Sequence, residues 1–184
     1  MLKQATPYSL EKFTGIVKEY QNRVYNQAYR MLGNSEDAEE TTQDIFLKVY
    51  HSLTDFRGDS ALSTWIYRIT ANECISRLRK KQLKVTSMDE PIGEDGETFA
   101  AFIADDGEGP EETVMRSEMD EIIRDEVQNL PPNWAMAISL FHFDDLSYDE
   151  IAEAMDIPRA TVGTYILRGR NQLAKKLAQF ATAD

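Results

Sequence analysis

The 184-residue chain lacks several features that would assign it early to a class of protein. Its one cysteine, Cys74, excludes an internal disulfide, and two isolated histidines, His51 and His142, form no metal-ligand cluster. No apolar run approaches the roughly 18 residues of a membrane span. The first ten residues hold no apolar stretch behind a basic head, as a secretory signal would. We therefore expect a cytoplasmic chain with no bound metal and no membrane insertion of its own.

Sequence motifs of the common enzyme classes are also missing. There is no Gly-rich phosphate loop, no H-E-x-x-H and no C-x-x-C. Carboxylates are abundant, but many crowd into one segment with no scaffold that would separate their pKa values for acid–base catalysis. We expect a protein that is not an enzyme and that needs no cofactor.

Positive charge is scarce, with 20 Lys and Arg against 32 Asp and Glu, a formal net charge of −12. Taken alone, this excess argues against nucleic-acid binding, because phosphate repels an acidic protein. The excess lies in residues 85–126, which carry a net charge of −13. Residues 57–84 carry +5 and residues 157–184 carry +4, so a basic segment lies on either side and is suited to phosphate.

The acidic segment also divides the chain. Residues 85–110 collect glycine and proline among the acids, and clustered like charges extend a chain. On both sides, apolar residues recur at helical spacing, and no stretch shows the sustained alternation of a strand. We predict an all-α protein of two small helical domains, residues 1–84 and 111–184, joined by an acidic flexible linker at 85–110.

Several helix ends are visible in the sequence. Gly33-Asn34 is a stop for the first helix, and a second helix starts at Ser35. Its acidic first turns fit either a solvated helix N-terminus or a partner site, and the pattern alone favours the former. A third helix begins after the loop at 56–60 and ends in a basic run.

Residues 147–170 give the strongest local signal. Ser147 and Glu150 fit the capping box S-x-x-E, and Pro158 suits the first position of the next helix. Two helices joined by such a turn form a helix-turn-helix pattern, whose second helix suits a DNA major groove. The same pattern also occurs as an ordinary packing unit, and the residues alone leave both interpretations open.

Residues 57–84 combine basic and aromatic side chains, which suits single-stranded nucleic acid. Two simpler interpretations stand beside this one. Trp65 lies on an apolar stripe, which favours a place in the core. Arg79 and Lys80 fit a solvated helix end as well as they fit phosphate contact.

Two blocks of the chain resemble a known family. The first block comprises residues 37–48, 56–60 and 64–69 with Asn72, and the second comprises residues 130–132, 146–153 and 157–170. They resemble regions 2 and 4 of bacterial RNA polymerase sigma factors of the extracytoplasmic-function (ECF) group, in the sigma-70 family. Two blocks in the family's order and with its spacing are more specific than either alone.

The resemblance implies protein partners. Region 2 of the family binds the clamp coiled coil of the largest polymerase subunit, and the flap region of core RNA polymerase is a second contact. The residues implied at the coiled coil are Asp37, Glu39, Glu40, Gln43, Asp44 and Phe46. An anti-sigma factor, which would hold the chain at the inner membrane face, is also implied.

The resemblance also implies contacts with two promoter elements. At the −10 element, implied contacts are Phe56, Arg57, Asp59, Ser60, Trp65, Arg68 and Asn72, with Arg77, Arg79 and Lys80 on the DNA backbone. At the −35 element they are Arg159, Thr161, Gly163, Thr164, Tyr165, Arg168 and Arg170. The recognition helix departs from the family pattern, because Gly163 and Tyr165 stand where basic residues are usual. Fewer phosphate contacts predict weaker and less salt-dependent duplex binding.

We therefore expect a sigma factor that binds core RNA polymerase and directs promoter-specific transcription initiation. It would recognise the −35 duplex and would melt and capture the −10 element, with weak DNA binding when polymerase is absent. The alternative is a stand-alone helix-turn-helix regulator that binds duplex operators. Such a regulator would need no region 2 block.

Overall fold

The computed structural model describes residues 7–56, 58, 60–87 and 123–181. In chain order, its elements are α1 (Pro7–Leu32), α2 (Ser35–Ser52), the 3-10 turn η1 (Leu53–Asp55), α3 (Leu62–Ser87), α5 (Pro132–His142), α6 (Tyr148–Met155) and α7 (Arg159–Ala181). A further helical stretch covers residues 123–128, and no strand occurs among the described residues, as the all-α prediction requires. The predicted linker lies outside the described residues, apart from its first three, which belong to α3.

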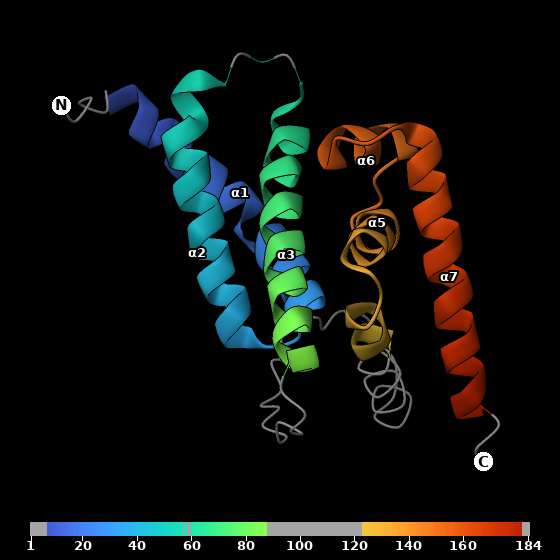
Figure 1. Ribbon diagram of the computed structural model, residues 1–184. Helices are drawn as coiled ribbons and strands as arrows, with labels where there is room; N and C mark the ends of the chain where they lie inside the picture. The colour runs from blue at the N-terminus through green and yellow to red at the C-terminus, as the bar shows by residue number, and fades with distance from the viewer. Residues whose placement is uncertain (1–6, 57, 59, 88–122, 182–184) are drawn as a thin grey trace, which may run out of the picture.

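Helices α1, α2 and α3 form the first group and contact one another (Figure 1). In α1, Ile16, Tyr20, Val24 and Ala28 recur every fourth residue, so they share one face of the helix. All four are buried, and Ala28 is completely inaccessible. The apolar spacing in the sequence therefore corresponds to the buried face of this helix.

The turn between α1 and α2 follows directly from two residues. Gly33 has φ +82°, a left-handed conformation that glycine adopts readily, and α1 ends at Leu32 before it. Asn34 then caps α2, because its Oδ1 accepts a hydrogen bond from the N–H of Asp37 at 2.7 Å. The predicted end of the first helix and the predicted start of the second at Ser35 are confirmed.

Helices α5, α6 and α7 form the second group. The predicted capping box is present: Ser147 Oγ accepts from the N–H of Glu150 at 3.3 Å, and Glu150 Oε2 accepts from the N–H of Ser147 at 2.8 Å. The Glu150 carboxylate also accepts from the Ser147 hydroxyl at 2.7 Å, and this bond together with the one from the Ser147 N–H lowers the pKa of Glu150. Helix α7 begins at Arg159, so Pro158 precedes the helix, and its predicted place at the first helical position is wrong.

The interior glycine of α7 allows this helix to pack closely on α5. A Cβ atom on Gly169 would lie 2.9 Å from Cγ1 of Ile138 and 3.6 Å from Cδ1 of Leu130. The first distance is too short for a real contact, so with a side chain there either Ile138 or one of the helices would have to shift. The conformational cost of an interior glycine, about 1 kcal/mol, is therefore offset by close helix packing.

Replacing Gly169 with alanine is expected to lower the free energy of unfolding by up to about 2 kcal/mol. Overpacking costs about 1–3 kcal/mol, and the better helix propensity of alanine offsets about 1 kcal/mol of it. Gly163→Ala in the same helix is the matched control, because a Cβ there meets Tyr148 Cε2 at an ordinary 3.6 Å. That variant should gain up to about 1 kcal/mol. Thermal unfolding followed by circular dichroism measures both, and shifts of the same sign would contradict this packing.

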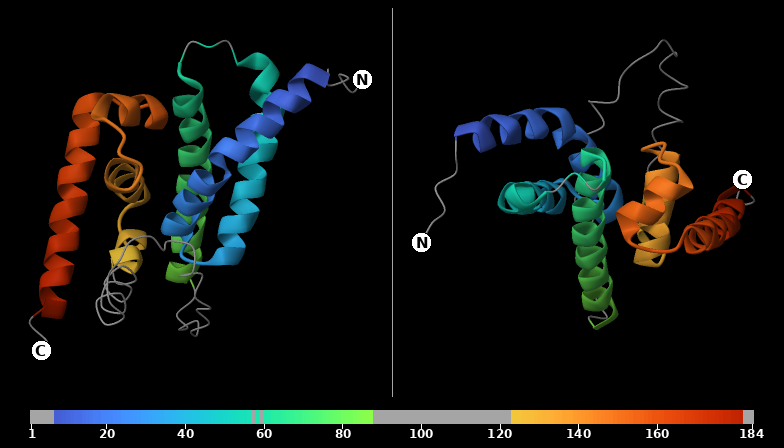
Figure 2. Two further views of the ribbon diagram at one scale, coloured as in Figure 1. Left: turned by 180° about the vertical axis from the view of Figure 1, so that it is seen from behind. Right: turned by 90° about the horizontal axis from the view of Figure 1, so that it is seen from above.

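The two groups of helices lie against each other. Helix α3 contacts both α5 and α6, and α1 contacts α5. Figure 1 shows α3 between α1 and α2 on one side and α5–α7 on the other, and the view from above in Figure 2 shows the same order. Buried residues of both groups form one hydrophobic cluster. The sequence predicts two helical units but contains no signal for this contact between them.

No helix in the described part of the chain is both long and apolar enough to cross a bilayer.

Candidate nucleic-acid and partner interfaces

The acidic residues of α2 form an exposed face. Glu39, Glu40 and Gln43 are exposed, and the Asp44 side chain is 42% exposed. Leu47 lies one turn beyond Gln43 on the same side of the helix and is 56% exposed, which is unusual for a large apolar side chain. Sequence reasoning missed Leu47, although its four-residue spacing from Gln43 places it on this face. The surface therefore combines negative charge with an apolar contact.

Two residues predicted on this face are placed elsewhere by the structure. Phe46 is only 7% exposed and belongs to the hydrophobic core. The Asp37 carboxylate accepts a hydrogen bond from Asn34 Nδ2 at 2.6 Å and so takes part in the N-terminal cap of α2. The structure therefore assigns Phe46 to packing and Asp37 to the helix end, and the exposed acidic face begins at Glu39.

A charge cluster links α2 to α3. Arg77 of α3 forms ion pairs with Glu40 at 3.3 Å, with Asp44, and with Glu73 of its own helix at 3.2 Å. Lys48 of α2 also pairs with Glu73. Partial burial alone would raise the pKa of Glu73, but hydrogen bonds from Lys48 and Arg77 hold it below its usual value. The Arg77 guanidinium thus faces carboxylates of α2, whereas Arg79 and Lys80 are exposed to solvent.

A row of predicted DNA contacts follows one face of α3. Trp65, Arg68 and Asn72 are separated by three and four residues, so they share this face. Asn72 is exposed. Trp65 is half-buried, and its ring lies 4.9 Å from that of Phe56, at an interplanar angle of 41°. Trp65 therefore packs against the core, as its apolar stripe predicts, and still exposes part of the ring.

The remaining predicted residues of this surface lie at its two ends. Arg79 and Lys80 are exposed in the last turns of α3. Ser60 is half-buried in the loop before the helix. Arg57 and Asp59 lie outside the described residues. The described part of the surface thus runs from an aromatic pair at the start of α3 to a basic end.

The N-terminal half of α7 presents polar side chains to solvent. Arg159, Thr164 and Arg168 are exposed, and Thr161 is half-buried. Thr164 Oγ1 donates to the carbonyl of Ala160 at 3.0 Å within the helix. Positions 161, 164 and 168 follow helical spacing, so they form one outward row. This row is available to enter a groove.

Three basic side chains of α7 have partners in the described structure. The Arg168 guanidinium lies over the ring of Trp134 on α5, 5.8 Å from its centroid. Arg159 Nε lies 3.0 Å from Asp149 Oδ1 in an exposed pair, which contributes little to stability. Arg170 Nε lies 3.1 Å from His142 Nε2, with its guanidinium over the ring of Phe141. Burial and the nearby Arg170 lower the pKa of His142. Arg170 therefore faces α5, as Arg168 does through Trp134.

The two α7 residues that depart from the family pattern, Gly163 and Tyr165, both lie against other parts of the protein. Tyr165 is half-buried and packs against the core, so its side chain contributes to the helix-turn-helix unit. Gly163 lies against the ring of Tyr148 on α6. Neither position presents a basic group, and we keep the prediction of weaker duplex contact.

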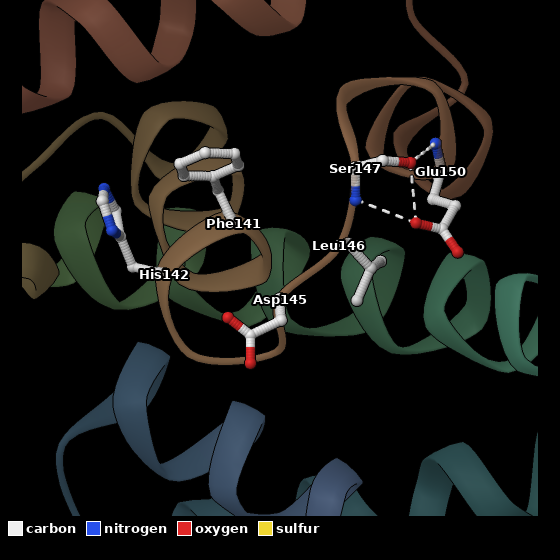
Figure 3. Close-up of a pocket in the computed structure, with 6 residues that line it drawn as sticks. All are labelled: Phe141, His142, Asp145, Leu146, Ser147 and Glu150. Carbon is white, nitrogen blue, oxygen red and sulfur yellow. Dashed lines mark hydrogen bonds between the residues drawn. The ribbon is translucent and has the colours of Figure 1, made fainter.

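An open hollow of about 390 Å³ lies at the turn between α5 and α6. It is lined by Phe141, His142, Asp145, Leu146, Ser147 and Glu150, as Figure 3 shows. Ser147 and Glu150 use their polar atoms in the capping box, drawn there as dashed lines. None of the predicted contact residues lines this hollow.

Comparison with known proteins agrees with the order of these surfaces. Residues 16–84 match Sigma-70 region 2, and residues 120–173 match Sigma-70, region 4. The ECF RNA polymerase sigma factor SigW of Bacillus subtilis is 37% identical over 96% of this chain and 94% of its own. The RNA polymerase sigma-H factor of Pseudomonas aeruginosa is 34% identical over 90% of this chain and 86% of its own.

Solved structures share the fold. The sigma factor RpoE of Bartonella quintana, in complex with the anti-sigma factor NepR, has a TM-score of 0.68 and 21% identity, covering 91% of this chain and 98% of that one. CnrH, in complex with the cytosolic domain of CnrY, has a TM-score of 0.62 and 20% identity. The match covers 92% of this chain and 90% of that one.

The fold and the surfaces together define a two-part, all-α transcription factor, and the relatives specify which kind. The chain belongs to the sigma-70 family, in the group of ECF RNA polymerase sigma factors. Its function is promoter-directed transcription initiation, and the resemblance derived from the motifs is confirmed.

Proposed function

We propose that the chain binds core RNA polymerase through the acidic face of α2 and carries two promoter-reading surfaces, on α3 and α7. The observation that carries this proposal is the presence of all three surfaces on separate helices of one chain. The protein supplies recognition and strand capture and is not itself a catalyst. We assign polymerase and −10 binding to residues 1–84, −35 binding to residues 111–184, and the tether to residues 85–110.

The contact with polymerase rests on charge and shape. Glu39, Glu40 and Asp44 present carboxylates on one helix, which suits a basic helical partner. Leu47 adds apolar area beside them. The partner we propose is the clamp coiled coil of the largest subunit, with the flap region as a second contact for the C-terminal helices.

Capture of the −10 strand rests on the row of Trp65, Arg68 and Asn72. An unpaired base needs a ring to stack on and polar groups along its edge. The Phe56–Trp65 pair supplies the aromatic surface, and Asn72 supplies both a donor and an acceptor. Arg79 and Lys80 extend the surface with charges that suit the DNA backbone.

Duplex reading of the −35 element rests on the N-terminal half of α7. The row of exposed Thr164 and Arg168 with half-buried Thr161 suits base edges and phosphates in a major groove. Arg159 lies at the helix start, where it can reach the backbone once it leaves Asp149. We assign Gly163, Tyr165 and Arg170 a supporting role in this contact. Gly163 and Tyr165 pack within the helix-turn-helix unit, and Arg170 faces α5.

We propose an anti-sigma factor as a further partner. The first solved structure described above holds a sigma factor together with an anti-sigma factor, and the second holds CnrH together with the cytosolic domain of CnrY. We place this protein in the cytoplasm, where such a partner could hold it at the inner membrane face.

A footprinting experiment separates this function from a stand-alone operator-binding regulator. With core polymerase, the chain should protect two separate segments upstream of a start site, and without polymerase it should protect neither. A regulator of the alternative class would protect its operator alone, and polymerase would add nothing. Protection by the free chain at the concentration that suffices with polymerase would contradict the proposed function.

Removing the basic end of α3 is expected to weaken DNA binding without changing its sequence preference. Arg79→Ala with Lys80→Ala removes two charges, and each contact with a single-strand phosphate contributes about 0.7 to the salt slope. The slope of log affinity against log salt for the polymerase complex should fall by about 1.4. Lys12→Ala with Lys18→Ala, on the exposed side of α1, is the matched control and should leave the slope unchanged. An equal slope for both double variants would argue against backbone contact at this end.

A further inference from the structure

Helix α5 presents two aromatic rings to α7. Trp134 and Phe141 lie two helical turns apart on α5, so both are on one face of the helix. Ile138 lies between them on this face, and its Cγ1 would be 2.9 Å from a Cβ atom on Gly169. Because Gly169 has no side chain, α7 packs closely at this point. One ring therefore lies on each side of the close contact along α5.

The two arginines beside Gly169 each lie over one of these rings. The Arg168 guanidinium is 5.8 Å from the centroid of the Trp134 ring, and the Arg170 guanidinium is 5.3 Å from that of Phe141. A cation within roughly 6 Å of an aromatic centroid is attracted to the face of the ring, and tryptophan attracts it most strongly. The close packing at Gly169 thus brings one arginine to each ring.

The two arginines differ in how their N–H groups are used. Arg170 donates from Nε to His142 Nε2 at 3.1 Å, so both its face and its edge are engaged within the protein. Arg168 is exposed, and among the described residues its N–H groups form no hydrogen bond or ion pair. An aromatic ring holds the face of a guanidinium and leaves the donors along its edge free. Trp134 therefore orients Arg168 without using the donors that would meet a base pair.

The orientation of this guanidinium matters for reading DNA. Arginine recognises a base edge through two N–H groups at once, which requires one orientation of its plane. A side chain that is ordered before binding also loses less conformational freedom on contact. In the row of Thr161, Thr164 and Arg168, only Arg168 is charged, and Gly163 and Tyr165 add no charge beside it. Discrimination among base pairs by α7 therefore depends strongly on how Arg168 is held.

We propose that Trp134 is a positioning residue for Arg168 and thereby a determinant of base-pair specificity at the −35 element. The proposal rests on the proposed function, because the placement of Arg168 matters only if this residue reads the −35 duplex. Trp134 acts through the guanidinium and need not touch DNA itself. Its half-buried ring packs against the core, so it gives Arg168 a fixed support.

Competition binding by the full chain on core polymerase tests this role. A set of promoter duplexes carries each alternative base pair at every position of the −35 element in turn, and discrimination is the ratio of affinities at one position. Arg168→Ala identifies the position that this arginine reads, as the one where discrimination falls most. Trp134→Leu should lower discrimination at that position about two- to fivefold, as expected for an exposed cation–π contact, and leave the other positions unchanged.

Three further variants separate positioning from a purely structural role. In the Arg168→Ala background, Trp134→Leu should cause no further loss at any position, because the group that it positions is already gone. Trp134→Phe keeps a ring with a weaker attraction, so its discrimination should lie between those of the wild type and Trp134→Leu. Phe143→Leu is the matched control. The Phe143 ring is 4.9 Å from the guanidinium of Arg30 on α1, so its loss should leave discrimination intact.

Three results would overturn the positioning role: an equal loss at all positions in Trp134→Leu, a loss that persists in the Arg168→Ala background, or equal discrimination in the wild type, Trp134→Phe and Trp134→Leu. Circular dichroism checks the helix content of each variant. Should Trp134→Leu lose helix content, the flexible and ringless Trp134→Met replaces it in both backgrounds. If Arg168→Ala lowers discrimination at no position, −35 reading by this arginine fails and the positioning role fails with it. A normal loss in Arg168→Ala with none in Trp134→Leu defeats the positioning role alone.

Discussion

Reversing the charge of Glu39, Glu40 and Asp44 together to lysine is expected to weaken binding to core polymerase at least about 100-fold. These carboxylates lie on one face of α2, and disrupting charge pairs at a protein interface costs about 2–5 kcal/mol, with tenfold in affinity for about every 1.4 kcal/mol. Titration of labelled core polymerase, with the dissociation constant determined at fixed salt, measures the effect. Lower affinity with an intact fold would support the assigned face.

Control variants separate charge at the interface from charge in general and from folding. Reversing Glu11, Glu19 and Asp125 makes the same change in net charge at exposed positions away from this face and should alter affinity little. Glu39→Lys alone lies outside the Arg77 cluster, so it should weaken binding without loosening the contact between α2 and α3. Equal losses in the test and control triple variants would remove α2 from the interface.

Asn72→Ala is expected to reduce promoter opening by about 10- to 100-fold while leaving polymerase affinity unchanged. Asn72 is exposed on the same face of α3 as Trp65, about two turns further along the helix, and correct polar contacts to one base edge contribute about 1–3 kcal/mol. Every 1.36 kcal/mol corresponds to a factor of ten. The rate at which thymines in the −10 element become reactive to permanganate reports opening, and a separate titration reports polymerase affinity.

The matched control for this prediction is Asn129→Ala. Asn129 is also exposed but lies before α5, near Gln82 in the last turns of α3 and away from Asn72, so both opening and polymerase affinity should stay at the wild-type level. Parallel losses of opening and polymerase affinity in Asn72→Ala would mean that the residue supports the fold or the protein interface. That result would count against base capture by α3.

Local rules in the sequence predict the ends of helices and the rows of residues on their faces. Gly33, Asn34 and Ser147 act through atoms within four residues of themselves, so their effects follow from sequence spacing. The row of Trp65, Arg68 and Asn72 follows from helical periodicity in the same way. The two functional regions are recognised from motifs of this local kind.

Contacts between helices need information that spacing does not hold. Helical spacing places Phe46 on the apolar face of α2, where it is buried, but only the way α2 docks decides that Glu40 faces Arg77. Arg30 and Asp144 are 114 positions apart, so nothing local signals their pairing. From the sequence alone, Gly169 only lowers the stability of its helix. Its role in close packing is seen once Ile138 is found against it. The Arg30–Asp144 pair and the close packing of α7 therefore become visible only in three dimensions.

Run-off transcription with purified core polymerase tests the central claim most directly. On genomic promoter fragments, we predict discrete transcripts that appear only when the chain is added. The chain with Glu39, Glu40 and Asp44 reversed should not produce them, and the control chain with Glu11, Glu19 and Asp125 reversed should. Transcripts of equal amount with and without the chain on every fragment, although polymerase binds it, would contradict a role in initiation.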